Sequence, residues 1–284
     1  MKKTVTILLA LTLVLSCVFA FAACGGKGNE TTTAAPVDTT AAENTTAAAT
    51  VVKDVDDIVS KGKMIVGITE YPPMDYKDEN GEWTGFDAEY AKAVAAKLGV
   101  EAEFFVIADW EAKAFELESK NIDCVWNGMT ITDSVKASMD VTNAYVKNAQ
   151  VIVMKADKAA EYKTIESMAD LSFAVEKGSA GEAAATENNL KATAVTYQSD
   201  AILEVASGAV DACIIDLTMA STMTGEGSSY SDLTAALELN EEEYGIGCRK
   251  GSDLVAKINE ITEELKADGT LTALAEQYEL TLVG

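Results

Sequence analysis

The sequence predicts an α/β fold of two lobes that are joined by two hinge strands and enclose a ligand cleft. From about residue 52 onward, short apolar strand patterns alternate with amphipathic helical patterns. This alternation is typical of parallel strands covered by helices. It occurs in two series, and long extended segments at 145–155 and 236–250 join them. We expect these two segments to be the hinge strands.

The first series begins with the strand pattern KMIVGIT and continues through an Asn-Gly turn between two short extended pieces. The next segment, 87–99, is predicted to be a helix because apolar residues recur every four positions from Tyr90 to Leu98 and Gly99 ends the pattern. The remaining expected elements are a strand at 101–107, a helix at 110–119, a strand at 122–128 and a short helix from about Thr132.

The second series repeats the pattern and then leads into two terminal helices. Its expected strands are 172–178, 193–197 and 211–216, and its expected helices are 181–190, 200–208 with a Ser199 cap, and 217–223. The terminal helices, which begin near Ser252 and Thr270, need a sheet to pack on, so we assign them to the first lobe. The predicted lobes are therefore 52–146 plus 246–284, and 147–245.

Composition narrows the classes of function. The 284 residues include 46 acidic and 22 basic side chains, a net charge of −24, which makes nucleic acid an improbable partner. The chain has no histidine, which removes Ser-His, Cys-His and His-metal chemistry. We expect no metal, no cofactor and no catalytic residue. Beyond the N-terminal region three cysteines remain in apolar strands, and their odd number favours buried thiols over disulfides.

The N-terminus has the organisation of an exported lipoprotein. Residues 1–23 combine a basic start, an apolar run and the small pair Ala22-Ala23, and Cys24 follows directly, as in a bacterial lipobox. Residues 24–51 are predicted to be the lipidated cysteine and a flexible linker rich in threonine and alanine. We expect the mature protein to be held on the outer side of the cell membrane by the lipid on Cys24.

Six segments, in order, resemble the family 3 extracellular solute-binding proteins of ABC importers. They are YPPMDY (71–76), GFDAEYAKAVAAKLG (85–99), NIDCVWNGMTITD (121–133), VEKGSAGE (175–182), VDACIID (210–216) and YGIGCRKGSD (244–253). The resemblance implies a periplasmic-binding-protein-like (type II) fold, a small-molecule ligand such as an amino acid, and a membrane permease as partner.

The same resemblance implies the ligand-binding residues. It places the ligand between the aromatic faces of Tyr71 and Trp110, which suit an apolar side chain or an ammonium group. It assigns the ammonium of the ligand to Asp216, although an aspartate there also suits a helix N-cap. Backbone and hydroxyl groups for the ligand are expected from Asn127, Gly128, Met129 and Thr130, and from Ser179 and Ala180 at a helix start that favours an anion.

One position departs from the family pattern. Val135 stands where the family has an arginine that binds the ligand carboxylate with two hydrogen bonds. Lys136 or Lys177 supplies at most a point charge instead. Either the carboxylate rests on backbone N–H groups and a lysine, or the ligand is not a standard α-amino acid. The single arginine, Arg249, is expected to stabilise structure.

The sequence and the resemblance together therefore predict a substrate-binding lipoprotein of an ABC importer that captures a small polar solute, an amino acid, by hinge closure. Two alternatives remain open. One is a binding protein for a small molecule other than an amino acid. The other is a dehydratase-type enzyme on the same fold, for which Glu70 or Glu176 would have to supply the acid.

Overall fold

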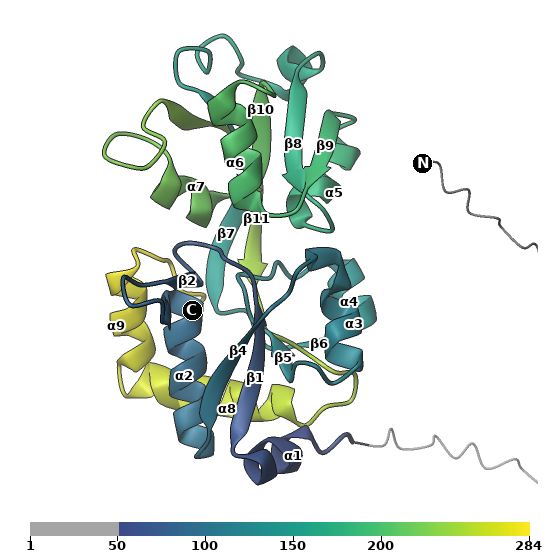
Figure 1. Ribbon diagram of the computed structural model, residues 1–284, viewed down its shortest axis with the longest axis vertical. Helices are drawn as coiled ribbons and strands as arrows, with labels where there is room; N and C mark the ends of the chain where they lie inside the picture. The colour runs from purple at the N-terminus through teal and green to yellow at the C-terminus, as the bar shows by residue number, and fades with distance from the viewer. Residues whose placement is uncertain (1–50) are drawn as a thin grey trace, which may run out of the picture. The chain divides into compact units, whose positions relative to one another are not determined.

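The computed structural model describes residues 51–284 (Figure 1). The predicted signal peptide, the predicted lipidation site Cys24 and all of the predicted linker except Val51 lie outside the described residues. Residues 51–284 belong to one compact unit. Within residues 51–284, no helix is both long and apolar enough to cross a membrane.

The first sheet has the strand order β4-β1-β5-β12-β6 and takes strands from both ends of the described chain. β1 is parallel to β4 and β5, whereas β12 is antiparallel to β5 and β6. The strands of this lobe, with the β2-β3 hairpin, are β1 (Lys63–Ile68), β2 (Tyr76–Lys77), β3 (Trp83–Thr84), β4 (Glu101–Val106), β5 (Cys124–Val125), β6 (Asp140–Val141) and β12 (Gly247–Cys248). Its helices are α1 (Asp54–Lys61), α2 (Phe86–Leu98), η1 (Trp110–Ala112), α3 (Lys113–Glu118), α4 (Asp133–Ser138), α8 (Leu254–Ala267) and α9 (Thr270–Gln277).

The second sheet has the strand order β11-β7-β10-β8-β9. β8 is parallel to β9 and β10, and β7 is antiparallel to β10 and β11. Its strands are β7 (Val146–Lys155), β8 (Ser172–Glu176), β9 (Lys191–Val195), β10 (Ala212–Asp216) and β11 (Leu233–Tyr244). The helices of this lobe are η2 (Ile165–Met168), α5 (Ala180–Glu187), α6 (Gln198–Ser207) and α7 (Leu217–Met223).

Figure 1 shows the two sheets in separate lobes, with β7 and β11 running side by side between them. The first residue of β7, Val146, pairs with Leu282 at the chain end, and the last residue of β11, Tyr244, pairs with Thr130 of the first lobe. The two extended segments of the sequence thus form an antiparallel pair of connecting strands. The two-lobed α/β fold predicted from the sequence is confirmed.

Aromatic side chains fill the part of the core behind residues 127–130, a loop that is predicted to bind ligand and that we call the binding loop. Tyr90 on α2 meets Trp126 edge to face with 4.7 Å between ring centroids, and Phe86 stacks on Tyr145 at 6.1 Å. All four side chains are fully buried or nearly so. Contacts between buried aromatic rings stabilise the fold because they remove apolar surface area from water. This aromatic cluster fixes the strand end from which the loop at 127–130 leaves.

Arg249 has a structural role in the first lobe. Its Nε and Nη2 groups bind the Asp54 carboxylate, with the shortest contact at 2.9 Å, and Nη1 donates to the carbonyl oxygens of Leu117 and Ile122. The three cysteines of the described chain, Cys124, Cys213 and Cys248, are buried free thiols.

Three local expectations were wrong. The sheets are mixed rather than parallel, because the connecting strands and β12 run back against their neighbours. The strand expected at 122–128 pairs only through Cys124–Val125, since the chain turns into the binding loop directly afterwards. The helix expected to be capped by Ser199 begins at Gln198 with Tyr197 in the cap position, and Asp200 accepts the Tyr197 N–H.

Candidate functional site

A cavity of about 430 Å³ lies between the two lobes, and we call it the inner cavity. Loops that follow strands of both sheets form its walls, as expected for a ligand site in an α/β fold. The lining residues from the first lobe are Trp110, Lys113, Asn127, Gly128, Met129, Thr130, Thr132, Asp133, Ser134 and Val135. Those from the second lobe are Glu176, Gly178, Ser179, Ala180, Ala183, Glu187, Gln198 and Asp216.

Trp110 and Lys113 form one wall. Trp110 begins the short helix η1, and Asp109 caps that helix by accepting a hydrogen bond from the Glu111 N–H at 3.1 Å. The Lys113 ammonium lies 4.7 Å from the centroid of the Trp110 ring and donates to Gly178 O of the other lobe at 3.1 Å. Burial lowers the pKa of Lys113 to about 8.

The binding loop at 127–130 is held by side chains beneath it. Asn127 exchanges two hydrogen bonds with Thr69 at the end of β1, at 2.6 and 2.7 Å. Gly128 has φ of +55° and donates its N–H to Asp87 at 2.6 Å, and a Cβ there would lie 2.6 Å from the Tyr71 ring. Only glycine fits this approach. The loop therefore presents its backbone in a fixed position.

The turn from β8 into α5 is capped by the chain itself. Ser179 Oγ accepts the Glu182 N–H at 3.1 Å, and the Gly178 N–H donates to the Glu182 carboxylate at 2.8 Å. The start of α5 therefore already holds a negative charge from its own chain, which satisfies part of the helix N-terminus.

Asp216, the last residue of β10, is the centre of a buried polar network. Its Oδ1 accepts from Asn148 Nδ2 at 2.7 Å and Gln150 Nε2 at 2.6 Å. Gln198 Nε2 donates to the other oxygen, Oδ2. The carboxylate makes no cap bond to α7, although Asp216 occupies the N-cap position. Burial, and then the nearby Glu242 carboxylate, raises the pKa of Asp216 to about 8.

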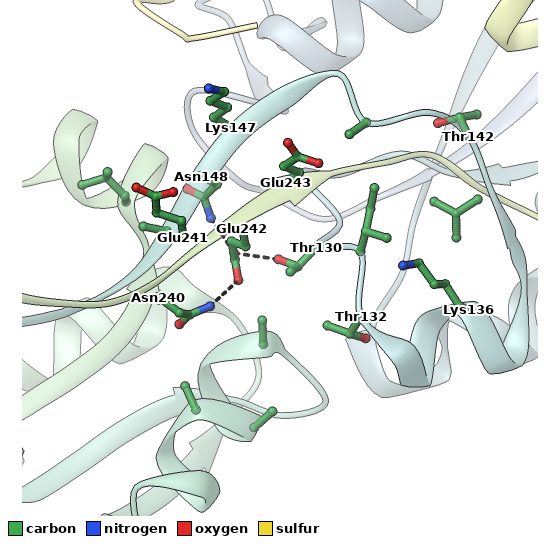
Figure 2. Close-up of a pocket in the computed structure, with 18 of the residues that line it drawn as sticks. Thr130, Thr132, Lys136, Thr142, Lys147, Asn148, Asn240, Glu241, Glu242 and Glu243 are labelled. Carbon is green, nitrogen blue, oxygen red and sulfur yellow. Dashed lines mark hydrogen bonds between the residues drawn. The ribbon is translucent and has the colours of Figure 1, made fainter. Parts of the chain in front are cut away.

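Glu242 on β11 links this network to the binding loop. Its Oε1 accepts from the same two amides, Asn148 at 2.6 Å and Gln150 at 2.8 Å. The same oxygen also accepts from Thr130 Oγ1 at 2.8 Å. Figure 2 shows Glu242 close to Asn148 and Thr130. One carboxylate thus joins the connecting strands to the first lobe.

Glu176, at the end of β8, is the one buried carboxylate of the inner cavity with no bonded partner in the described part of the chain. It is 4% exposed and lines the cavity. Lys113 acts on it only through its charge, and neither a hydrogen bond nor an ion pair joins them. Burial, and then repulsion from Asp216, raises the pKa of Glu176 to about 8.

A larger hollow of about 1210 Å³, the outer groove, adjoins the inner cavity and shares Thr130, Thr132, Ala180, Ala183 and Glu187 with it. Glu241, Glu243 and Lys147 from the connecting strands line it (Figure 2). This groove leads from the lobe junction toward the inner cavity.

Eight of the nine residues predicted to bind ligand line the inner cavity. They are Trp110, Asn127, Gly128, Met129, Thr130, Ser179, Ala180 and Asp216. The ninth, Tyr71, is buried behind Gly128, and the structure does not bring it to the cavity wall. Its hydroxyl instead lies 2.6 Å from both Thr218 Oγ1 of the second lobe and Tyr244 Oη at the end of β11.

The basic residues proposed as substitutes for an arginine lie elsewhere. Lys177 pairs across the lobes with Glu111 at 2.6 Å and Asp109 at 3.4 Å. Lys136 lines the outer groove. Val135 lines the inner cavity with an apolar side chain that is 8% exposed.

Sequence reasoning missed Lys113, Gln198 and Glu242, and it considered Glu176 only as an enzyme acid. Asn148 and Gln150 were missed as well. Two signals in the sequence were available, one for Glu176 and one for this pair of amides. Glu176 ends a strand, the same position in its strand that Asp216 has in β10. Asn148 and Gln150 are two residues apart in an extended segment, so their side chains project from the same face. No sequence signal identifies Lys113, whose place depends on packing between lobes.

The described residues contain no cluster of three or more histidine, cysteine, aspartate or glutamate side chains suited to a metal ion. The chemistry on the page is that of charge and hydrogen bonding. Two buried carboxyl groups, Glu176 and Asp216, line a cavity of about 430 Å³ together with the Lys113 ammonium and the Trp110 indole.

Comparison with known proteins agrees with this geometry. Residues 64–281 match the family model for bacterial extracellular solute-binding proteins, family 3. The L-cystine-binding protein TcyJ of Escherichia coli is 29% identical over 229 residues, which cover 79% of this chain and 85% of that protein. The arginine-binding extracellular protein ArtP of Bacillus subtilis is 33% identical over 230 residues, 77% of this chain and 86% of that protein.

Among solved structures, a similar one is the ancestral amino acid-binding protein AncCDT-1, described as a precursor of cyclohexadienyl dehydratase. It superposes with a TM-score of 0.71 at 32% identity and covers 79% of this chain and 98% of its own. The fold is therefore that of solute-binding proteins.

Proposed function

The chain belongs to family 3 of the bacterial extracellular solute-binding proteins, and from this premise we propose that it is the solute-binding component of an ABC importer. It captures a small polar solute that carries an ammonium group, as amino acids do, and delivers it to a membrane permease. The observation that supports this most directly is Asp216, a buried carboxylate that faces a cavity of about 430 Å³.

The network around Asp216 suits an ammonium group. Three side-chain amides from Asn148, Gln150 and Gln198 donate to its carboxylate and hold it in place. A cation in the cavity would replace the proton that burial otherwise favours on this carboxyl group. The relatives named for cystine and arginine support a solute of this kind.

Hinge closure is the proposed capture step. β7 and β11 are the segments about which the lobes would turn, since they connect the two sheets. Contacts such as Tyr71 with Thr218, and Lys113 with Gly178 O, join the lobes on the cavity side. Opening the lobes breaks these contacts and admits the solute.

Isothermal titration calorimetry of the purified protein against amino acids, amines and small carboxylates tests the binding role. We expect at least one ammonium-bearing solute to bind and to raise the melting temperature by mass action. X-ray scattering should then show a smaller radius of gyration with the solute than without it. Absence of binding by every ammonium-bearing solute would contradict the proposal.

The attachment proposed is a lipid on Cys24, on the outer side of the cell membrane. Metabolic labelling with a fatty-acid analogue should label the protein, and Cys24→Ala should release it from the membrane fraction. Equal membrane retention of the two proteins would refute this anchor.

A dehydratase-type enzyme is the second candidate, favoured by the raised pKa of Glu176, which is about 8 and leaves an acid proton at neutral pH. Glu70, the other acid considered, is exposed and does not line the inner cavity. Binding without turnover is the proposed activity. Incubation with ring-carboxylate substrates, followed by NMR, distinguishes the two, because product formation would establish the enzyme.

A further inference from the structure

We propose that the solute of the inner cavity is an organic cation, an amine or a guanidine, that carries no carboxylate. This inference rests on the proposed binding function and names the class of its solute. It decides between the two ligand classes that the sequence left open.

Glu176 provides the first argument. Its carboxylate is 4% exposed, lines the inner cavity and has no hydrogen bond or ion pair with any of residues 51–284. A buried carboxyl group without a hydrogen-bond partner is costly, and native proteins rarely retain a buried polar group that has none. A cationic group in the cavity supplies the missing partner.

The aromatic wall provides the second argument. The Trp110 ring already holds an ammonium group, that of Lys113, at 4.7 Å from its centroid. The indole face is the best of the aromatic faces for a cation. Trp110 and Glu176, from opposite lobes, therefore both favour a positive charge in the same cavity.

The third argument concerns what a carboxylate would meet. Among residues 51–284, Lys113 is the only basic side chain that lines the inner cavity, and its ammonium donates to the carbonyl oxygens of Trp110 and Gly178. The start of α5 already carries the Glu182 carboxylate on Gly178 N–H. Val135 adds only an apolar surface. A solute carboxylate would thus lie among carboxylates without a free basic side chain.

Matched pairs of solutes that differ only by the carboxylate test this inference. We would measure arginine against agmatine, and lysine against cadaverine, by titration calorimetry with the purified protein at pH 7.5. Each amine is expected to bind at least tenfold more tightly than its amino acid. If either amino acid binds as tightly as its amine, the inference is wrong while the binding function stands.

The remaining outcomes separate the two proposals. If only neutral or anionic solutes bind, both the inference and the proposed ammonium site are wrong, although the chain is still a binding protein. If no small molecule binds, both proposals fall.

Three variants locate the effect. Val135→Arg places a guanidinium on the cavity wall and should move the preference toward arginine. Glu176→Gln should weaken agmatine binding at least tenfold, whereas Glu79→Gln, an exposed carboxylate of the β2-β3 turn, should leave it unchanged. Unchanged agmatine affinity in Glu176→Gln would overturn the inference even if Val135→Arg failed to fold.

Discussion

Replacing Glu176 with glutamine should stabilise the empty protein, because the carboxylate that the cavity holds is buried without a bonded partner. Burial raises the pKa of this group from 4.5 to about 8. The folded protein therefore binds a proton more tightly than the unfolded chain does. The stability that the protonated Glu176 side chain contributes to the folded protein is fully present below pH 4.5 and is lost as the pH rises through about 8.

The size of the effect follows from this difference in pKa. At pH 7 the loss amounts to about 3 kcal/mol of unfolding free energy, since each pH unit above the unfolded pKa contributes 1.36 kcal/mol. Glutamine does not ionise in either state but leaves an amide without a partner, so about half of this gain should remain. For a domain of this size, that corresponds to a rise in melting temperature of about 3 to 6 °C.

Thermal unfolding followed by circular dichroism, in wild type and Glu176→Gln at pH 5, 6, 7 and 8, measures the effect. The difference in melting temperature should be small at pH 5 and should grow with pH. The exposed Glu79→Gln variant controls for net charge and should show no such trend. A difference that is independent of pH, or a less stable variant at pH 8, would refute the argument that Glu176 is a destabilising buried charge.

Three further changes have clear expected results. Asp216→Asn places an amide against three amide donors, so solute affinity should fall about 100-fold, the cost of an unpaired buried polar group, as measured by calorimetry. Tyr71→Phe removes the hydroxyl that bonds Thr218 and Tyr244 and should weaken binding about 5- to 10-fold, with unchanged affinity ruling out a role in closure. Gly128→Ala forces a Cβ to within 2.6 Å of the Tyr71 ring at a residue with positive φ. The free energy of unfolding, measured by urea denaturation, should therefore fall by about 1–3 kcal/mol. Equal stability of the two proteins would contradict this steric argument.

Much of the fold could be predicted because the periodic patterns reflect burial. The helix at α2 and the apolar strands β1, β7 and β10 have patterns that burial alone determines. The antiparallel direction of β7 and β12 was not predictable from local pattern. It depends on how the chain returns between lobes, which is a property of the whole topology.

The candidate site was predictable where function depends on strand ends and glycine turns. Asp216 ends a strand and Gly128 sits in a turn that only glycine allows, so both positions have local signals. The contacts that Lys113 and Tyr71 make have no local signal, because they join segments that are distant in sequence. Glu176 has a local signal at its strand end, but its lack of a partner is visible only in three dimensions.

The position of Asn148 and Gln150 has a mechanical consequence. Two of the three amides that hold the Asp216 carboxylate belong to β7, a strand that runs from one lobe to the other. A change of charge on that carboxylate changes the strength of its hydrogen bonds with two side chains of this strand. Under the proposed function, recognition of the solute and the angle between the lobes would be coupled through this one segment of backbone. A substitution that stiffens or relaxes residues 146–150 should then alter affinity without touching the solute.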